Sequence, residues 1–283
     1  MRFIHLTDLH CSDPIIRSYF SKRALGWFSW KRRRRFRHDN EFLKRLIKNV
    51  LNDRPDLVVI TGDIVQVGTE IEIQSAKSFL SELFKGIPLM IVPGNHDNYA
   101  NDSFGYIAKY WKDFIQIAQG FPSVRRYGNL LLVGLMSGKP MPFWSAQGEL
   151  GVAQFERLKN ILAESNEKLV CLFMHHPPYS EGISRRKSLK MTDEFRDMLL
   201  EKKIALICHG HLHRNVVFDG LAPTKVFCTA SASACSGANS GSYRVFDVTP
   251  NSNGFEIEAT LKQLDPDSER INLVYKKSWP IGI

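Results

Sequence analysis

Short apolar runs alternate with longer segments of helical periodicity along this chain of 283 residues. The apolar runs predict β-strands at residues 3–6, 57–60, 89–92, 130–135, 169–174, 204–208, 225–229 and 243–248. The amphipathic segments predict helices at residues 40–51, 71–84, 106–119, 152–164 and 193–201. Strands that alternate with helices are typical of an α/β protein with at least partly parallel sheets. Since few helices separate the last strands, we expect a more antiparallel arrangement in the second half.

The composition is that of an ordinary globular protein, because 43% of the residues are hydrophobic and 24% are charged. These fractions exclude a disordered, collagen-like or coiled-coil chain. Neither an internal repeat nor a linker-like stretch interrupts the sequence. We therefore expect residues 1–283 to form a single domain, which carries an insert of distinct composition at about residues 14–38.

Positive charge is concentrated in this insert. The chain has 38 Lys and Arg residues against 29 Asp and Glu residues, a net charge of +9. Nine of the basic residues and none of the acidic ones lie in the insert, so the rest of the chain is neutral. Six large apolar side chains are interleaved with these cations: Phe20, Leu25, Trp27, Phe28, Trp30 and Phe36. Such a basic aromatic segment suits an anionic membrane surface. Nucleic acid is an alternative partner, and a solvated or partner-covered helix is a third interpretation.

The cysteines and the N-terminus indicate where the protein works. Cys171 and Cys208 lie inside apolar runs, and none of the five cysteines has Cys-x-x-Cys spacing, so we expect buried thiols in a reducing compartment. Met1 leads directly into a short strand, which is unlike a signal peptide. No apolar run approaches the ~20 residues that span a bilayer. We expect a cytoplasmic protein, with peripheral attachment to the inner face of a membrane as a further option. The sequence leaves the oligomeric state open.

Polar residues typical of metal sites follow five of the predicted strands. The segments at these strand ends read Asp8-Leu9-His10, Gly62-Asp63, Gly94-Asn95-His96-Asp97, His175-His176 and Gly210-His211-Leu212-His213. In an open α/β sheet, ligands bind beyond the carboxyl ends of the strands. We therefore expect these Asp, Asn and His side chains to meet at one edge.

The donor types indicate which ions would bind. Asp, Asn and His supply oxygen and imidazole ligands without a thiolate, which suits Mn, Fe, Zn or Co. Asp8 and His10 are two residues apart, so an extended backbone would point both to one side, and the same holds for His211 and His213. Seven donors exceed the needs of one tetrahedral ion and imply two ions. Two metals ~3.5–4 Å apart form the usual clamp for in-line displacement at phosphorus.

The ordered series Asp-x-His, Gly-Asp, Gly-Asn-His-Asp, His and Gly-His-x-His resembles the calcineurin-like metallophosphoesterase superfamily. The resemblance covers positions 8 to 213, and every motif is present. It implies an α/β sandwich of two mixed β-sheets flanked by α-helices. It also implies an enzyme, a metal-dependent phosphoric ester or diphosphate hydrolase with two divalent metal ions. We expect Mn, with Fe, Zn or Co as alternatives.

The resemblance further implies a role for each motif residue. Asp8, His10 and His213 would hold one metal; Asn95, His175 and His211 would hold the other. Asp63 would bridge both, and a bridging hydroxide would attack phosphorus. His96 would stabilise the transition-state oxyanion or protonate the leaving oxygen, and Asp97 would orient or tune His96.

Several other residues have a simpler interpretation. His176 would pack beside the site or support a ligand, and His5 and His38 are expected to be structural. His209 shares strand parity with His211 but lies outside the motif, so its role stays open. Cys11 is expected to pack rather than to ligate.

The choice of substrate rests on departures from known subfamilies. Ser/Thr protein phosphatases carry Gly-Asp-x-Val-Asp-Arg-Gly, whereas residues 62–68 lack that Asp and Arg, which disfavours a protein phosphatase. We expect cleavage of a phosphodiester or pyrophosphate bond. The insert favours a membrane-proximal enzyme near the chlamydial-type UDP-2,3-diacylglucosamine pyrophosphatase of lipid A synthesis, which resembles this chain in retaining a histidine at the position of His96. The alternatives are a soluble cyclic-nucleotide phosphodiesterase or glycerophosphodiesterase, a nuclease and a non-enzymatic protein-binding scaffold.

A second basic loop with Arg185, Arg186 and Lys187 is a candidate for binding substrate phosphate.

Overall fold

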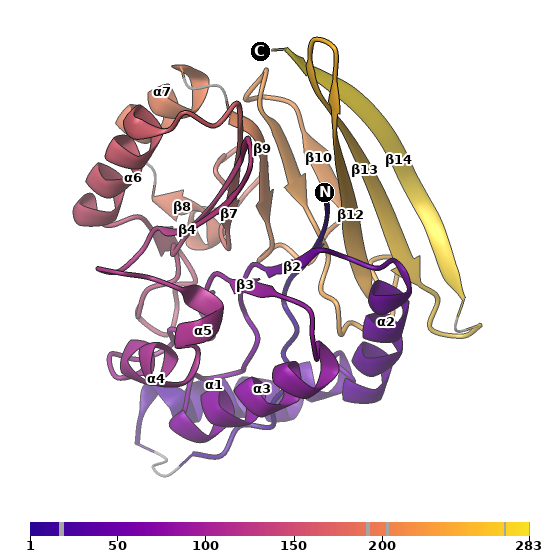
Figure 1. The fold of residues 1–283 in the computed structure, drawn as a ribbon. Coiled ribbons are helices and arrows are strands. Elements are labelled where there is room, and N and C mark those ends of the chain that lie inside the picture. The colour runs from indigo at the N-terminus through magenta and orange to yellow at the C-terminus, as the bar shows by residue number, and fades with distance from the viewer. Residues whose placement is uncertain (17–19, 191–192, 202–203, 269, 283) are drawn as a thin grey trace.

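Two six-stranded mixed sheets pack face to face, with helices on both outer faces (Figure 1). The computed structural model describes residues 1–16, 20–190, 193–201, 204–268 and 270–282. This arrangement confirms the expected α/β sandwich. Residues 17–19 of the predicted insert lie outside the described residues.

The first sheet has the strand order β14-β13-β12-β1-β2-β3. Its parallel half consists of β1 (Arg2–Leu6), β2 (Leu57–Ile60) and β3 (Leu89–Ile91). Its antiparallel half consists of β12 (Ser242–Asn251), β13 (Gly254–Leu264) and β14 (Ile271–Gly282). The expectation of antiparallel sheet late in the chain is therefore confirmed for this sheet.

The second sheet has the order β10-β11-β9-β7-β5-β4. Four parallel strands form its centre: β5 (Leu130–Leu135), β7 (Leu169–Met174), β9 (Ile204–His209) and β11 (Lys225–Cys228). The antiparallel edges are β4 (Ser123–Tyr127) and β10 (Val216–Phe218). A separate pair joins β6 (Gly148–Glu149) to β8 (Leu189–Lys190).

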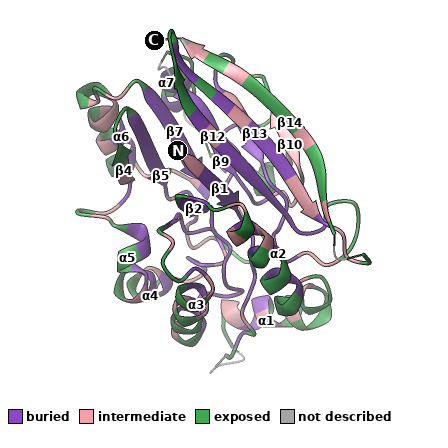
Figure 2. Ribbon diagram, turned by 45° about the vertical axis from the view of Figure 1, so that its right-hand side comes forward, coloured by how far each residue is buried: buried purple, intermediate pink, exposed green. Residues whose placement is uncertain are grey.

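The central strands of the two sheets, such as β1, β2, β7 and β9, read as continuous apolar runs because both of their faces are buried. Phe3 of the first sheet contacts Phe173 of the second in the layer between them. Alternate residues of the same strands, such as Ile4 and Leu172, face the helices instead. Figure 2 shows the buried central strands, the largely exposed edge strand β14 and helices whose outer surfaces are exposed.

The helices form two outer layers. Those on the first sheet are α2 (Asn40–Asn52), α3 (Glu70–Leu83), α4 (Ser103–Tyr110) and α5 (Lys112–Ile115). Those on the second are α6 (Val152–Glu164) and α7 (Asp193–Glu201). The insert forms α1 (Lys22–Arg32) and the short 3-10 helix η1 (Arg34–Phe36), and the second basic loop forms the 3-10 helix η2 (Arg185–Lys187). Among the described residues, no helix combines the length and apolar character needed to cross a bilayer.

Two predictions of local structure are wrong. The helix expected at 106–119 begins earlier and breaks after Tyr110, because the buried Trp111 turns inward and donates its indole N–H to Ile73 O at 2.9 Å. The chain then ends α5 at Gln116, which has a left-handed φ of 44°. The strands β4, β6, β8, β10, β13 and β14 were not predicted. Polar side chains alternate along β13, and most of β14 is exposed, so neither reads as an apolar run.

Candidate metal centre

All seven predicted metal ligands lie at one edge of the sandwich. Asp8 and His10 follow β1, Asp63 follows β2, and Asn95 follows β3, all in the first sheet. His175 follows β7, and the pair His211 and His213 follows β9, in the second sheet. The centre is therefore built jointly by the carboxyl ends of strands from both sheets.

A left-handed backbone conformation directs most of these side chains toward the metal centre. Seven non-glycine residues have positive φ, and five of them are predicted ligands: Asp8, His10, Asp63, His211 and His213. L-residues adopt this conformation at a cost of about 1–3 kcal/mol, and such strain clusters at functional sites. The expectation that an extended backbone directs Asp8 and His10 to one side is therefore wrong, because left-handed turns do so instead.

Two glycines allow the loops to approach closely. Gly62 has a φ of 85°, and a Cβ there would clash with the backbone of Gly94. A Cβ on Gly210 would overlap the hydroxyl of Thr7 and lie against the carboxylate of Asp8. The loops after β1 and β9 can meet only because that side chain is missing.

Asp8, His10 and His213 form a first cluster. One ligand atom from each lies within 4.8 Å of the other two. His213 Nε2 lies 3.1 Å from Asp8 Oδ1. His10 is buried, and its Nδ1 has no hydrogen-bond partner. The geometry leaves a carboxylate oxygen and two imidazole nitrogens directed at a common point.

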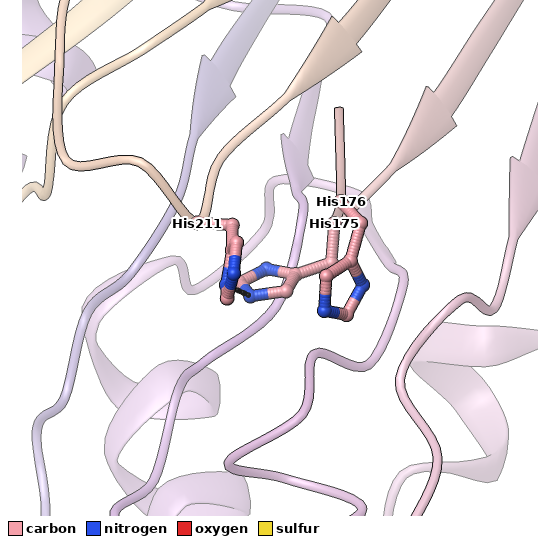
Figure 3. A group of neighbouring side chains, drawn as sticks. All are labelled: His175, His176 and His211. Carbon is pink, nitrogen blue, oxygen red and sulfur yellow. Dashed lines mark hydrogen bonds between the residues drawn. The ribbon is translucent and has the colours of Figure 1, made fainter. Parts of the chain in front are cut away.

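Asp63, Asn95, His175 and His211 form a second cluster. His175 Nε2 lies 3.2 Å from each of three atoms: Asp63 Oδ2, Asn95 Oδ1 and His211 Nδ1. The last contact is drawn in Figure 3. His175 Nδ1 lies 2.7 Å from the carbonyl oxygen of Thr61, which can only accept, so Nδ1 carries the hydrogen. This contact turns Nε2 toward the other donors, as supporting groups do for metal-bound histidines.

The carboxylates and imidazoles shift each other's pKa values. Burial opposes charge on Asp63, but His175 and His96 outweigh it and hold the pKa of Asp63 well below its usual range. Burial likewise lowers the pKa of His175, and the Asp63 carboxylate outweighs this and raises the pKa to about 9. A metal ion that binds His175 must therefore displace a proton.

The donor set fits divalent cations. His10 Nδ1 and His211 Nε2 are buried and have no hydrogen-bond partner among the described residues. Buried polar atoms are normally paired, so these atoms are suited to a ligand that the protein itself does not supply. Asp8 is shared by two potential metal-binding groups, one with His10 and His213 and one with Asp63 and His175. The sharing supports a pair of ions rather than one.

His96 lies between this centre and the insert. Its backbone N–H donates to Asp63 Oδ1 at 2.7 Å. Its Nδ1 lies 2.6 Å from Gln66 O and therefore carries the hydrogen, so Nε2 is the ring atom left to act in the cavity. Nε2 is 4.0 Å from Asp63 Oδ2.

Asp97 does not orient His96 as expected. Its carboxylate accepts backbone N–H bonds from Gly94, Ile64 and Val65 at 2.8–3.0 Å, and no bond to His96 occurs within the described part of the chain. Asp97 is fully buried, and burial together with Asp63 raises its pKa to about 7. It joins the loops after β2 and β3 instead, and so positions Asp63 and Asn95 indirectly.

The remaining histidines differ in their surroundings. Both ring nitrogens of His5 contact threonine hydroxyls, which agrees with a structural role. His176 lies beside His175 and His211 (Figure 3). Its ring nitrogens already face Ser137 Oγ and Ala146 O. His209 Nδ1 lies 3.0 Å from Gly210 O, and its Nε2 has no partner.

His38 is closer to the site than the sequence indicated. Its ring centroid is 4.4 Å from that of His10, and it lines the cavity over the metal centre. The spacing of His38 from the other histidines matches no metal-binding motif. A contact between the end of the insert and the loop after β1 also has no signature in the sequence. Cys11 packs in the core, as expected.

A cavity of about 820 Å³ opens over the metal centre. Arg186 and Lys187 are among the residues that line it, whereas Arg185 is not. The role of these three residues in binding substrate stays a prediction. Sequence reasoning also missed Arg34 of the insert and the exposed pair Phe143 and Trp144, which line the same cavity.

Seven oxygen and imidazole donors at the common edge of two mixed sheets are typical of a binuclear metallophosphoesterase. The chain belongs to the calcineurin-like phosphoesterase family, whose model matches residues 1–215.

Relatives and solved structures agree with this family. A probable glycerophosphodiester phosphodiesterase of Arcobacter nitrofigilis is 32% identical over 59% of this chain and 59% of its own length, less than two thirds of that protein. A probable cyclic nucleotide phosphodiesterase of Vesicomyosocius okutanii is 26% identical over 67% of this chain and 76% of that protein. The fold is similar to that of a dimetal phosphatase from Danio rerio, with a TM-score of 0.66 and 13% identity over 97% of this chain and 99% of the other.

Proposed function

We propose that this protein is a binuclear-metal phosphodiesterase. The main support for this proposal is that the two clusters share residues. Asp8 and His175 each belong to two potential metal-binding groups. The names of the relatives support a phosphodiester substrate, since both are phosphodiesterases. The cavity over the centre supports an anionic substrate, because its described lining includes five basic residues and one carboxylate, that of Asp63.

We assign the metal-binding and proton-donating roles to different residues of the chain. Asp8, His10 and His213 would hold one cation, Asn95, His175 and His211 the other, and Asp63 would bridge them. Two divalent cations, Mn in our proposal, would supply Lewis-acid stabilisation of phosphoryl charge. His96 Nε2 faces the cavity and, when protonated, would donate to a phosphoryl or leaving oxygen. Thr61 O and Gln66 O hold His175 and His96 in the required orientation through their Nδ1 hydrogens.

A second candidate is a pyrophosphatase that acts on a lipid-linked nucleotide, such as UDP-2,3-diacylglucosamine. The observation that favours it is the rim of the cavity, where Leu25, Phe143 and Trp144 are exposed. Neither relative described above is named a pyrophosphatase, so this substrate ranks second to a simple phosphodiester.

Another surface of the insert supports attachment to an anionic membrane surface. Phe28 and Phe36 are exposed on the insert beside the cations Lys31, Arg32 and Arg35. Aromatic side chains favour the bilayer interface, and each nearby cation adds up to ~1 kcal/mol on an anionic leaflet. We propose pelleting with vesicles of phosphatidylserine and phosphatidylcholine, but not with phosphatidylcholine alone, as the test.

Reconstitution with Mn²⁺ followed by substrate comparison tests the function. We expect turnover of bis(p-nitrophenyl) phosphate and of a glycerophosphodiester or cyclic nucleotide. Preferred turnover of UDP-2,3-diacylglucosamine would favour the second candidate, and degradation of single-stranded DNA would favour a nuclease. Fewer than one metal per chain and no hydrolysis of any of these substrates would contradict the proposal and favour a protein-binding scaffold.

A further inference from the structure

The basic insert is tied to the body of the protein at both ends. At its start, Arg23 pairs with Asp102 and donates to the carbonyl oxygens of Val67 and Gly68. At its end, the amide of Cys235 donates to Arg37 O at 3.0 Å. The insert is therefore a fixed part of the structure, and Figures 1 and 2 both show α1 beyond the lower end of the sheets.

Close packing brings the insert over the loops that carry the metal centre. A Cβ on Gly26 of α1 would lie 2.6 Å from Val67 Cγ1 and 2.8 Å from Tyr99 Oη. Lys22 donates to Tyr99 O at 2.6 Å. These contacts hold α1 and the following turn against the loops after β2 and β3, which supply Asp63 and His96.

The turn after α1 places Arg34 directly on His96. Arg34 Nη1 lies 3.0 Å from His96 Nε2, and Nη2 donates to Gly26 O at 2.9 Å. Nη1 is also 2.7 Å from His96 Nδ1, but that nitrogen donates to Gln66 O and cannot accept. The guanidinium therefore lies beside the one ring nitrogen of His96 that faces the cavity.

The contacts of Arg34 within the described residues leave N–H donors and positive charge available for a ligand. A guanidinium has five N–H groups, and these two contacts use two of them. Among the described residues, its buried Nε has no hydrogen-bond partner and no carboxylate forms an ion pair with it. A largely desolvated cation without a counter-ion is costly. Its position in the cavity wall, next to the metal centre, gives an anion access to it.

We propose that Arg34 is a substrate-binding residue of the hydrolytic site, where it binds non-bridging oxygens of the phosphoryl group held over the metal centre. The planar fork of Arg suits phosphate oxygens, and such charge-assisted bonds are stronger than neutral ones. The insert then contributes to turnover of soluble substrates, independently of any membrane. This inference rests on the proposed phosphodiesterase function.

Steady-state kinetics of Arg34→Ala, Arg34→Lys and Arg33→Ala test the proposal with bis(p-nitrophenyl) phosphate. Arg33 is a matched control, because it is the adjacent insert arginine, is exposed and does not line the cavity. We expect Arg34→Ala to lower kcat/KM by about 10–100-fold, as for loss of a hydrogen bond to a charged group. Arg34→Lys keeps the charge and should lose less, and Arg33→Ala should stay within about twofold of the wild type. The metal content should be the same in all four proteins.

A double-mutant cycle separates phosphate binding from an effect that acts only through His96. If Arg34 binds the phosphoryl group, Arg34→Ala still lowers kcat/KM in a His96→Ala background. No further loss in that background overturns the proposal. Equal losses in Arg33→Ala and Arg34→Ala also overturn it, because they would indicate a general effect of charge.

Binding of inorganic phosphate to the Mn²⁺-loaded protein gives a readout that does not depend on turnover. Calorimetry should show a dissociation constant about tenfold higher or more for Arg34→Ala than for the wild type and Arg33→Ala. If the wild type hydrolyses no diester but Arg34→Ala still weakens phosphate binding, the proposed function fails and the anion site stands. If the diester is hydrolysed but neither measurement responds to Arg34, this inference fails and the function stands.

Discussion

His175 Nε2 lies 3.2 Å from Asp63 Oδ2, and this contact joins the two sheets at the metal centre. Asp63 follows β2 of the first sheet, whereas His175 follows β7 of the second. Both side chains are almost fully buried. Asp63 forms a potential metal-binding group with Asp8 and His175, and Asp8 also belongs to the group with His10 and His213. Under the proposed function, Asp63 would be the residue that both cations share.

Asp63→Ala should therefore remove more metal than His213→Ala. We expect the Asp63 variant to retain little of either ion after reconstitution with Mn²⁺. The His213 variant should lose about one ion per chain, because His213 belongs to the cluster with Asp8 and His10 alone. Metal analysis of the desalted proteins measures the difference. Equal metal content in the two variants would mean that Asp63 is not a shared ligand.

Removal of metal should destabilise the whole fold, because the ligands come from both sheets. A ligand at 100 times its dissociation constant adds about 2.7 kcal/mol per site, which corresponds to a rise in Tm of about 5–10 °C in a chain of this size. Thermal unfolding with and without a chelator, and again after added Mn²⁺, measures this shift. A Tm that does not respond to either addition would contradict a metal site between the sheets.

The sequence allowed the metal ligands to be predicted because strand ends share an edge. Asp8, Asp63 and His175 each follow an apolar run, and parallel strands bring such positions together whatever the loops do. The backbone conformation of the same residues could not be predicted, since the left-handed turns at Asp8 and His10 arise from contacts between loops. Residue type and spacing therefore predicted which side chains meet at this edge, but not the backbone conformation that directs them there.

Contacts between the insert and the body had no sequence signal. Arg34 is one of four consecutive arginines, and nothing in that run distinguishes the one that reaches His96. His38 was likewise expected to be structural, although its ring lies 4.4 Å from that of His10. Such pairings depend on how α1 packs against Val67 and Tyr99, which local pattern does not encode.

Asp97→Ala should weaken metal binding as well as turnover. Its carboxylate accepts three backbone N–H groups from the loops after β2 and β3, and each buried donor left without a partner costs about 1–3 kcal/mol. Asp97→Asn keeps the size and one acceptor oxygen and should lose less. Chemical denaturation and metal analysis of both variants measure the effect. Normal stability and metal content with slow turnover would restore the orienting role first expected for Asp97.

Gly210→Ala should disrupt the first cluster. The added methyl group would overlap Thr7 Oγ1 and press on the Asp8 carboxylate, so the loops after β1 and β9 would have to separate. Gly105→Ala is the matched control, because a Cβ there meets nothing within 4 Å and the residue lies in α4. In a helix this change is neutral or stabilises by up to about 1 kcal/mol. We expect metal loss and inactivity only in the Gly210 variant, and unchanged metal content in both variants would be evidence against the close approach.

His96→Ala should lower turnover by ~10²–10³ while the metal content stays near normal, as for loss of one donor to the transition state. His96 contacts Asp63 through its backbone N–H, which the substitution retains. The leaving group distinguishes the two roles of Nε2. If the ring protonates the leaving oxygen, the loss should be larger for an alkyl diester than for bis(p-nitrophenyl) phosphate, because nitrophenolate departs without a proton. An equal loss for both substrates would indicate that His96 stabilises phosphoryl charge instead, and loss of metal in the variant would show that it is needed for metal binding.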